Sequence, residues 1–208
     1  MVADRAIALA DAEGLEAVTI RRLATDLGVT PMALYWHFRT KDELLAGAAD
    51  RVLEALELPA PVTAWSAELQ VLLTELVRVL RAHPQLVGRV AERFLASPAG
   101  LALADRALAA LLHAGFSHTE AGQLAGHAMR TAMALATDDV VDGSGVSTAE
   151  RDEHLRQKRS MLAGLPAGDY PSLIACADAM TYCAEPDEFF ALGIHHFIAG
   201  VEGMAAAG

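Results

Sequence analysis

The sequence has no asparagine, only two cysteines and few aromatic residues, which make up 5% of its 208 positions. Hydrophobic residues nevertheless account for 53% of the chain, and most of them are alanine and leucine. This composition is typical of helical proteins rather than of β-sandwiches. We see no apolar run long enough to span a bilayer, and the N-terminus lacks the pattern of a signal peptide. We therefore expect an all-α protein that contacts no membrane.

The scarcity of cysteine argues against a disulfide-stabilised fold. Cys176 and Cys183 are seven residues apart in a segment that we predict to be helical. That spacing puts them about 10 Å apart along the helix axis, too far for a disulfide. Both should be reduced thiols, and a cytoplasmic protein is expected.

Acidic residues outnumber basic ones, and the net charge of −11 at first argues against nucleic acid as a partner. The distribution of charge changes that conclusion. Residues 1–51 contain six basic and eight acidic residues, so most of the excess lies further along the chain. Between Thr19 and Lys41 there are four basic residues and one acidic residue, Asp26. A locally positive face on an acidic body can still bind phosphates.

The segment from Thr19 to Lys41 carries a dense set of helix start and stop signals. Thr19 is a good N-cap for a helix with apolar residues at positions 20, 23, 24 and 27, and Gly28 can adopt the positive φ that ends it. Thr30 is a second N-cap, followed by a proline at the first helical position. Thr40 and Glu43 predict a capping box for the next helix. Two short helices joined by a tight turn are typical of a helix-turn-helix that presents its second helix to the major groove.

The same residues resemble a known family. Ala24, Leu27, Gly28 and Val29, then Leu34–Phe38, then Lys41–Leu45 are similar to the DNA-binding domain of TetR-type bacterial transcriptional repressors. The resemblance is strong over residues 3–55 and looser beyond them. Family members often carry a longer basic N-terminal arm, and we expect no DNA contacts of that kind from this sequence.

The residues expected to contact DNA lie on the second helix and at the starts of its two neighbours. Residues at the N-terminus of that helix should meet base edges and thymine methyl groups, and the cations should meet phosphates. The resemblance implies DNA contacts for Arg21, Tyr35, Trp36, His37 and Lys41. The full predicted set is Arg21, Arg22, Thr30, Pro31, Met32, Ala33, Tyr35, Trp36, His37 and Lys41. Leu34 and Phe38 are expected in the core, and packing between helices is the alternative for the two large aromatic residues.

The proline-rich segment of residues 58–61 predicts a domain boundary. We assign residues 1–57 to a helix-turn-helix domain that includes a connecting helix, 41–57, and residues 58–208 to an effector-binding and dimerisation domain. Outside the helix-turn-helix pair, helices are predicted at residues 2–13, 41–57, 63–82, 85–96, 98–115, 117–137, 147–163, 172–182 and 186–203. Residues 138–149 have the composition of a mobile loop.

Two helices have the composition of an interface. Small residues on helix 117–137 permit close approach of another helix, and the last helix is apolar on more than one face. Burial inside one domain is the alternative, and the resemblance favours dimerisation because TetR-like proteins pair their final long helices in a four-helix bundle. The predicted interface residues are Ala121, Gly122, Ala125, Ala128, Phe190, Ile194, Phe197 and Val201.

An internal, mostly apolar pocket is expected in the larger domain, and the resemblance implies that it lies between the fifth and eighth helices. Large or polar side chains on those helices are the candidates for its lining. They are Trp65, His83, Phe94, Leu111, His127, Met129, Arg130 and Met133. Core packing would explain each of them nearly as well.

We expect no metal site and no cofactor. His195 and His196 are adjacent, so their side chains point about 100° apart on a helix. Glu150 and His154 share a helix face, which is more often a surface hydrogen-bonded pair. The resemblance places Ala91 where tetracycline repressors carry a metal-binding histidine, which argues against magnesium–tetracycline as the effector.

These observations favour a ligand-responsive, homodimeric repressor that binds double-stranded operator DNA and is released by a small effector. An activator or an effector-independent regulator of the same family fits the sequence as well. A helical ligand-binding protein that no longer reads DNA is a more distant alternative. An enzyme is disfavoured, because residues 143–145, Gly-Ser-Gly, lack the strand–turn–helix context of a nucleophile elbow.

Overall fold

The computed structural model describes residues 1–137, 148–181 and 186–207, and regular structure in these ranges is entirely helical. The predicted all-α fold is therefore confirmed. The chain divides into two compact units, one made of residues 1–137 with the chain from residue 193 onward, the other of residues 138–192.

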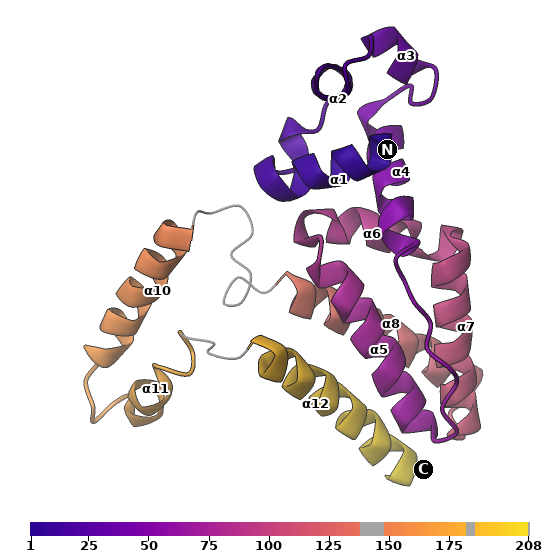
Figure 1. Cartoon of the computed structure of the whole chain (residues 1–208). Coiled ribbons are helices and arrows are strands. Elements are labelled where there is room, and N and C mark those ends of the chain that lie inside the picture. The colour runs from indigo at the N-terminus through magenta and orange to yellow at the C-terminus, as the bar shows by residue number, and fades with distance from the viewer. Residues whose placement is uncertain (138–147, 182–185, 208) are drawn as a thin grey trace. The chain divides into compact units, whose positions relative to one another are not determined.

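The first unit begins with a helix-turn-helix domain (Figure 1). Its elements are α1 (Val2–Glu13), the 3-10 turn η1 (Leu15–Ala17), α2 (Ile20–Leu27), α3 (Pro31–Tyr35) and α4 (Lys41–Leu53). The side chains of Leu9, Leu23, Leu34, Leu44 and Leu45 are buried where these helices meet.

The local signals read from the sequence act largely as predicted. The Thr19 hydroxyl accepts a hydrogen bond from the Arg22 amide at 3.2 Å, and Thr30 accepts one from the Ala33 amide at 3.3 Å. Gly28 has φ 66° and ψ 28°, in the left-handed region that glycine tolerates without steric cost. These caps set the turn between α2 and α3 and therefore the direction in which α3 is presented.

The predicted capping box at the start of α4 is only half formed. The Thr40 hydroxyl accepts a hydrogen bond from the Glu43 amide at 3.1 Å, as expected. The Glu43 carboxylate, however, accepts from the Arg39 amide at 2.6 Å rather than from the cap residue. This bond therefore fixes the short stretch of chain between α3 and α4.

Ion pairs tie α1 to the rest of the domain. Arg51 of α4 donates to Asp4 of α1 at 2.8 Å, and Arg5 of α1 donates to Asp26 of α2. The hydrogen bond from Arg51, reinforced by the N-terminal ammonium, lowers the pKa of Asp4 to about 2. The hydrogen bond from Arg5 likewise lowers the pKa of Asp26.

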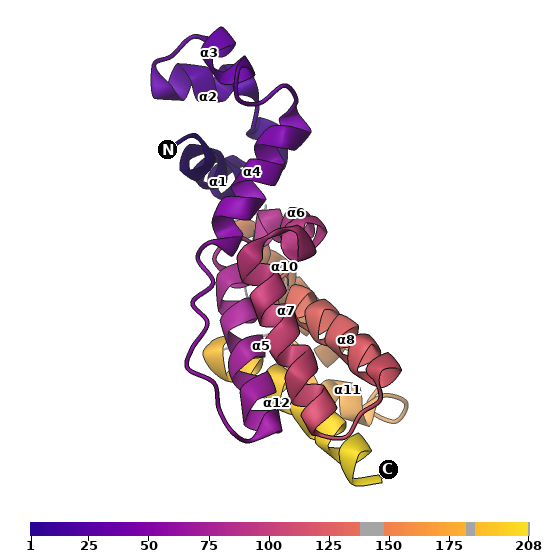
Figure 2. The same cartoon turned by 90° about the vertical axis from the view of Figure 1, so that its right-hand side faces the viewer.

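The larger part of this unit is a helical bundle. It contains α5 (Trp65–Arg81), η2 (Pro84–Leu86), α6 (Val87–Arg93), η3 (Phe94–Ala96), α7 (Pro98–His113), α8 (His118–Ala136) and the later part of α12 (Pro186–Ala207). Figures 1 and 2 show α4 running from the helix-turn-helix into this bundle, where it meets α6. The segment predicted as one helix, 85–96, is thus a short α-helix between two 3-10 turns.

The chain between α4 and α5 is held in a non-helical path by side chains of the bundle. The connecting helix predicted to reach Glu57 ends at Leu53. The Glu57 amide donates to Glu75 of α5 at 2.7 Å instead of to its own helix. Further along, Arg106 of α7 donates to the Pro59 carbonyl at 2.6 Å and pairs with the buried Glu68 of α5.

The second unit contains α10 (Thr148–Ala163) and α11 (Pro171–Cys176). Arg159 of α10 forms an ion pair at 3.1 Å with Asp178, which lies two residues beyond the end of α11. The helix predicted at 172–182 ends at Cys176, so the argument that one helix separates the two cysteines does not hold. Cys176 is an exposed free thiol, whereas Cys183 lies outside the described residues. Of the loop predicted at 138–149, residues 138–147 also lie outside them, and residues 148 and 149 belong to α10.

The last helix differs from expectation in its hydropathy. Residues 187–206 have a mean hydropathy of 1.3, enough by length and composition for a membrane span. The prediction that no segment of the sequence is apolar enough to span a bilayer is therefore wrong for this helix. Only 22% of this window is buried within the chain. Helices covered by other helices in soluble proteins have the same composition, so hydropathy alone does not place α12 in a bilayer.

Candidate DNA-binding surface and ligand cavity

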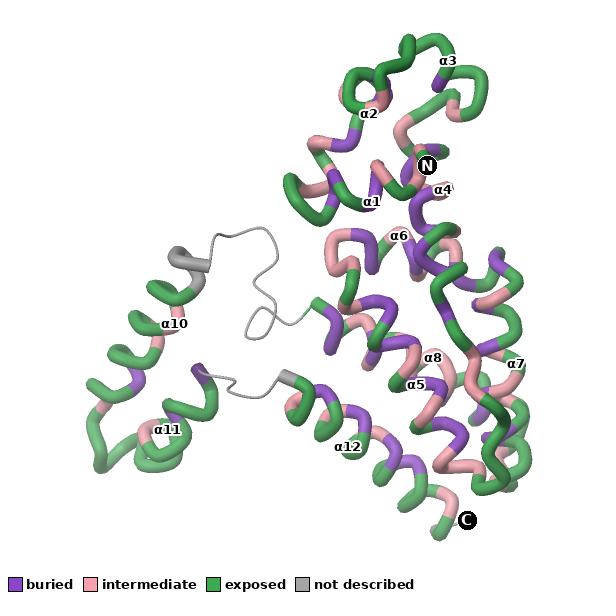
Figure 3. The backbone as a smooth tube through the Cα atoms, in the orientation of Figure 1, coloured by how far each residue is buried: buried purple, intermediate pink, exposed green. Residues whose placement is uncertain are grey.

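The second helix of the helix-turn-helix is α3, referred to below as the recognition helix, and it is exposed along most of its length. Within α3 only Leu34 is buried, the residue predicted to lie in the core. Figure 3 shows the chain around α3 mostly in the colour of exposed residues. Trp36 is 81% exposed and Met32 is 67% exposed. Tyr35 is 44% exposed, so neither aromatic residue is packed away between helices. All seven predicted contact residues from Thr30 to His37 face solvent.

The two neighbouring arginines of α2 have different surroundings. Arg22 donates to Glu13 through both terminal nitrogens, at 3.0 and 2.7 Å, and to Asp26 through Nε at 3.2 Å. These bonds raise the pKa of its guanidinium, the largest contribution coming from Glu13. Arg21 is exposed, and among the described residues no carboxylate pairs with it. Arg21 is thus available to DNA, whereas Arg22 is occupied in holding the domain together.

Two further cations lie beside the recognition helix. The Lys41 ammonium is 3.1 Å from the carboxylate of Glu16, a side chain that is 98% exposed. A surface pair of this kind contributes little to stability, so it does not commit Lys41 to Glu16. Arg39, which the sequence reading left out, is exposed just before the Thr40 cap, and its side chain has no ion pair with the described part of the chain. Its position between α3 and α4 is the signal in the sequence that could have identified it.

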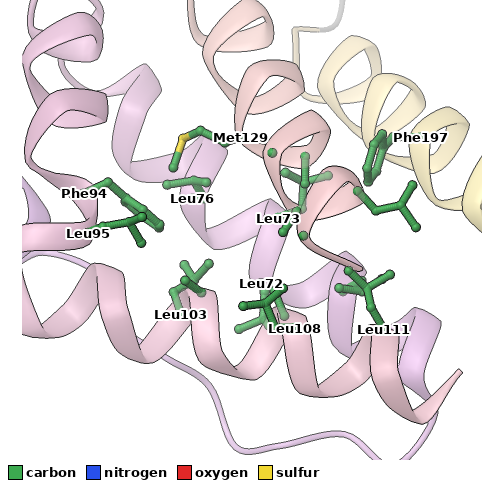
Figure 4. A pocket seen from close by; sticks show the side chains of 18 of the residues that line it. Leu72, Leu73, Leu76, Phe94, Leu95, Leu103, Leu108, Leu111, Met129 and Phe197 are labelled. Atoms are coloured by element: carbon green, nitrogen blue, oxygen red, sulfur yellow. The ribbon is translucent and has the colours of Figure 1, made fainter. Parts of the chain in front are cut away.

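The larger part of the unit contains a cavity of about 360 Å³ between α5, α6, α7, α8 and α12. Figure 4 shows leucine side chains of α5 and α7 across from Met129 of α8 and Phe197 of α12. Every lining residue is apolar; the set is Leu69, Leu72, Leu73, Leu76, Ala91, Phe94, Leu95, Leu103, Ala104, Ala107, Leu108, Leu111, Gly122, Leu124, Ala125, Gly126, Ala128, Met129 and Phe197. The cavity therefore offers a ligand contact area but no side-chain hydrogen bonds.

Only three residues predicted for the pocket belong to this lining: Phe94, Leu111 and Met129. The other five are Trp65, His83, His127, Arg130 and Met133, none of which lines it. Trp65 packs edge-on against Phe116, with ring centroids 6.3 Å apart. The prediction selected large and polar side chains, whereas the space exists because alanine and glycine form much of its wall.

The residues predicted for the dimer interface mostly face inward. Gly122, Ala125, Ala128 and Phe197 line the cavity, and Ala121 is buried. Three more, Phe190, Ile194 and Val201, are buried within the chain itself. The small residues of α8 therefore make room for the cavity, and the side of α12 that remains exposed is the opposite one.

Side-chain bonds connect the bundle to the helix-turn-helix. Arg93 of α6 donates to both oxygens of Asp50 in α4, at 2.9 Å each, and Arg89 donates to Asp42 at 2.9 Å. The residue after Arg93 is Phe94, which lines the cavity. One short segment thus contacts the cavity with one residue and the DNA-binding domain with the preceding one.

A second link explains the position of His83, which the sequence reading assigned to the pocket. Its Nδ1 atom lies 2.8 Å from the carboxylate of Asp11 in α1.

Across the described ranges, no group of three His, Cys, Asp or Glu side chains is placed to hold a metal ion. Ala91 lines the cavity at the position where the resemblance places a metal-binding histidine in tetracycline repressors.

An exposed helix-turn-helix linked to an apolar cavity defines the class of ligand-binding, DNA-binding regulators. Residues 2–48 match the family of bacterial regulatory proteins called the tetR family, and residues 58–205 match the tetracyclin repressor-like C-terminal domain. The chain belongs to the TetR family of transcriptional regulators, which are DNA-binding regulators and not enzymes.

Similarity to known members extends along the whole chain. An HTH-type transcriptional regulator of Saccharopolyspora erythraea is 29% identical over 98% of this chain and 84% of its own length. The class C tetracycline repressor of Escherichia coli is 30% identical over 96% of this chain and 88% of its own. The crystal structure of the TetR family protein ActR of Streptomyces coelicolor in complex with actinorhodin has a TM-score of 0.78 and 29% identity, covering 98% of this chain and 96% of that one.

Proposed function

We propose that this protein is a ligand-responsive, homodimeric transcriptional repressor that binds a pseudo-palindromic operator and is released by a small, largely apolar effector. The observation that carries this proposal is the link between its two sites. Arg93 bonds to α4 of the DNA-binding domain, and the adjacent Phe94 forms part of the cavity wall. A ligand that displaces Phe94 acts on α4 through this pair.

The DNA-binding half of the proposal is supported by the exposure of α3 and by three cations around it, of which only Lys41 has an ion pair within the described residues. In a dimer, two copies of α3 would enter successive turns of the major groove, with half-sites about 34 Å apart or a multiple of that distance. Arg21, Arg39 and Lys41 would then meet phosphates on either side of the groove.

Dimerisation is supported by a face of α12 that the described residues of its own unit leave uncovered. His195, His196, Ala199 and Gly200 are exposed, and Met204 is 51% exposed. Gly200 has nothing within 4 Å of where a Cβ atom would lie, so a second helix can approach closely there. Covering this face with a second copy would remove apolar surface that water otherwise contacts.

The effector half of the proposal is supported by the all-apolar lining of the cavity and by the relative solved with actinorhodin bound. An ionised ligand would lose its hydration in this cavity without gaining a side-chain partner. We therefore propose an uncharged effector whose affinity comes from apolar contact. Because the operator and the effector each favour one arrangement of α4, each must weaken the binding of the other by the same factor.

The first test is fluorescence anisotropy of the purified protein on duplexes from its own upstream region, at two salt concentrations and against a scrambled duplex. Saturable binding of two protomers to a pseudo-palindrome is expected, and an effector must lower that affinity. Tyr35→Ala and Lys41→Ala should weaken binding while the thermal unfolding midpoint stays nearly unchanged, because Tyr35 is exposed and Lys41 has only a surface ion pair to lose. Equal affinity for the scrambled duplex would overturn operator recognition, and a tight ligand that leaves operator affinity unchanged would overturn effector control.

A further inference from the structure

The recognition helix is unusual in the side chains that it does not carry. The residues that read base edges by paired hydrogen bonds are chiefly Arg, Lys, Asn, Gln, Asp and Glu. None of these occurs between Thr30 and His37, where the sequence reads TPMALYWH. This segment therefore has none of the side chains that form paired hydrogen bonds with one base.

The polar groups that are present have restricted roles. The Thr30 hydroxyl already caps the helix by accepting a hydrogen bond from the Ala33 amide. Tyr35, Trp36 and His37 stand at the end of α3, whereas the N-terminal residues of a recognition helix are those that contact the bases. Arg21 of α2 adds one donor from outside the helix.

The N-terminal turn of α3 is instead exposed and apolar. Pro31, Met32 and Ala33 follow one another and all face solvent, and Met32 is 67% exposed. The apolar group that a major groove offers is the 5-methyl of thymine. We propose that this protein recognises its operator mainly through thymine methyl groups that contact Pro31, Met32 and Ala33, so that each half-site presents thymines at the positions facing the N-terminus of α3. This inference rests on the proposed operator binding.

Replacing thymine with deoxyuridine tests the inference, because it removes the methyl group and keeps every hydrogen-bonding group of the base. Burying one methyl carbon corresponds to about fourfold in affinity, or about 0.8 kcal/mol. A duplex with every thymine in both half-sites replaced should bind about 15-fold more weakly if one methyl is contacted in each half-site. Replacement in the flanking sequence should leave the affinity unchanged.

A cycle with Met32→Ala locates the contact on the protein. The variant should bind the natural operator more weakly, and it should lose less on further replacement of thymine than the unchanged protein does. Leu101→Ala is the matched control, because Leu101 is an exposed apolar residue of α7, outside the DNA-binding domain. Circular dichroism of each variant checks that the fold is retained.

The outcomes separate this inference from the function on which it rests. If no duplex binds better than scrambled DNA, operator binding itself fails. If the natural operator binds specifically and the deoxyuridine operator binds equally well, thymine-methyl recognition is overturned and operator binding stands. If replacement weakens binding equally for the unchanged protein and for Met32→Ala, the contact through Met32 is overturned.

Discussion

Filling the cavity should remove ligand binding without harming the fold. Ala107 of α7 lies in the cavity wall and is 9% exposed. Ala107→Leu adds three carbon atoms that would project into the cavity. At about 0.8 kcal/mol for each buried carbon, the substitution can stabilise the fold by up to about 2.4 kcal/mol before any packing strain is subtracted. For a chain of this size that upper limit corresponds to about 5–10 °C in the unfolding midpoint.

The assay is a titration with N-phenyl-1-naphthylamine, an uncharged probe whose fluorescence rises in apolar surroundings. We expect the probe to bind the unchanged protein and to bind Ala107→Leu at least about tenfold more weakly, a difference of about 1.4 kcal/mol. The variant should bind the operator normally but respond poorly to the effector. Ala109→Leu is the matched control, since Ala109 is exposed on the same helix.

The result that would refute this reasoning is specific. If Ala107→Leu binds the probe as tightly as the unchanged protein while remaining folded, the probe does not occupy this cavity. If the exposed control loses the probe equally, the effect arises from the helix and not from the cavity.

Three further predictions test other parts of the structure. Arg21→Ala should lower operator affinity with little change in the unfolding midpoint. Arg22→Ala should lower the midpoint, because only this substitution removes ion pairs. Anisotropy titration measures the first effect and a thermal melting curve measures the second. Gly100→Ala would put a Cβ atom 2.0 Å from a backbone carbonyl oxygen, which at about 3 kcal/mol should lower the midpoint by about 6–12 °C, while Gly88→Ala, with open space around it, should not. The pKa of Asp4 is lowered from 3.8 to about 2. The stabilising interaction of its carboxylate is therefore present above about pH 4 and is lost as the pH falls toward 2. Asp4→Asn should lower the unfolding midpoint at neutral pH, and the gap between the midpoints of the variant and the unchanged protein should shrink near pH 2.

The helix-turn-helix could be predicted from the sequence because its signals are local. A threonine cap, a proline at the first turn or a glycine at positive φ acts within three or four residues of its position. Thr19, Gly28 and Thr30 therefore appear in the structure with the roles assigned to them. The end of α4 could not be predicted in this way, because Glu75, more than a helix away in sequence, captures the Glu57 amide.

The apolar cavity was predicted, but most of its lining residues could not be, because the pattern of small residues on a helix is ambiguous in the sequence alone. A stripe of glycine and alanine, as on α8, is compatible with close approach of another helix and with an empty space beside the helix. Gly122 and Ala128 were predicted to lie in a dimer interface, and within one chain both line the cavity. Only the positions of leucine side chains on α5 and α7, set by tertiary packing, distinguish the two.

The internal ion pairs of the DNA-binding domain bear on how many molecules a cell must make. Arg5, Arg22 and Arg51 are each engaged by carboxylates of their own domain, so few cations remain for phosphates. Each phosphate contact that is missing weakens binding to arbitrary genomic DNA, which outnumbers true sites by about a million or more. We expect little of the protein to be held on irrelevant sequence, so that a small number of copies suffices to keep one promoter occupied.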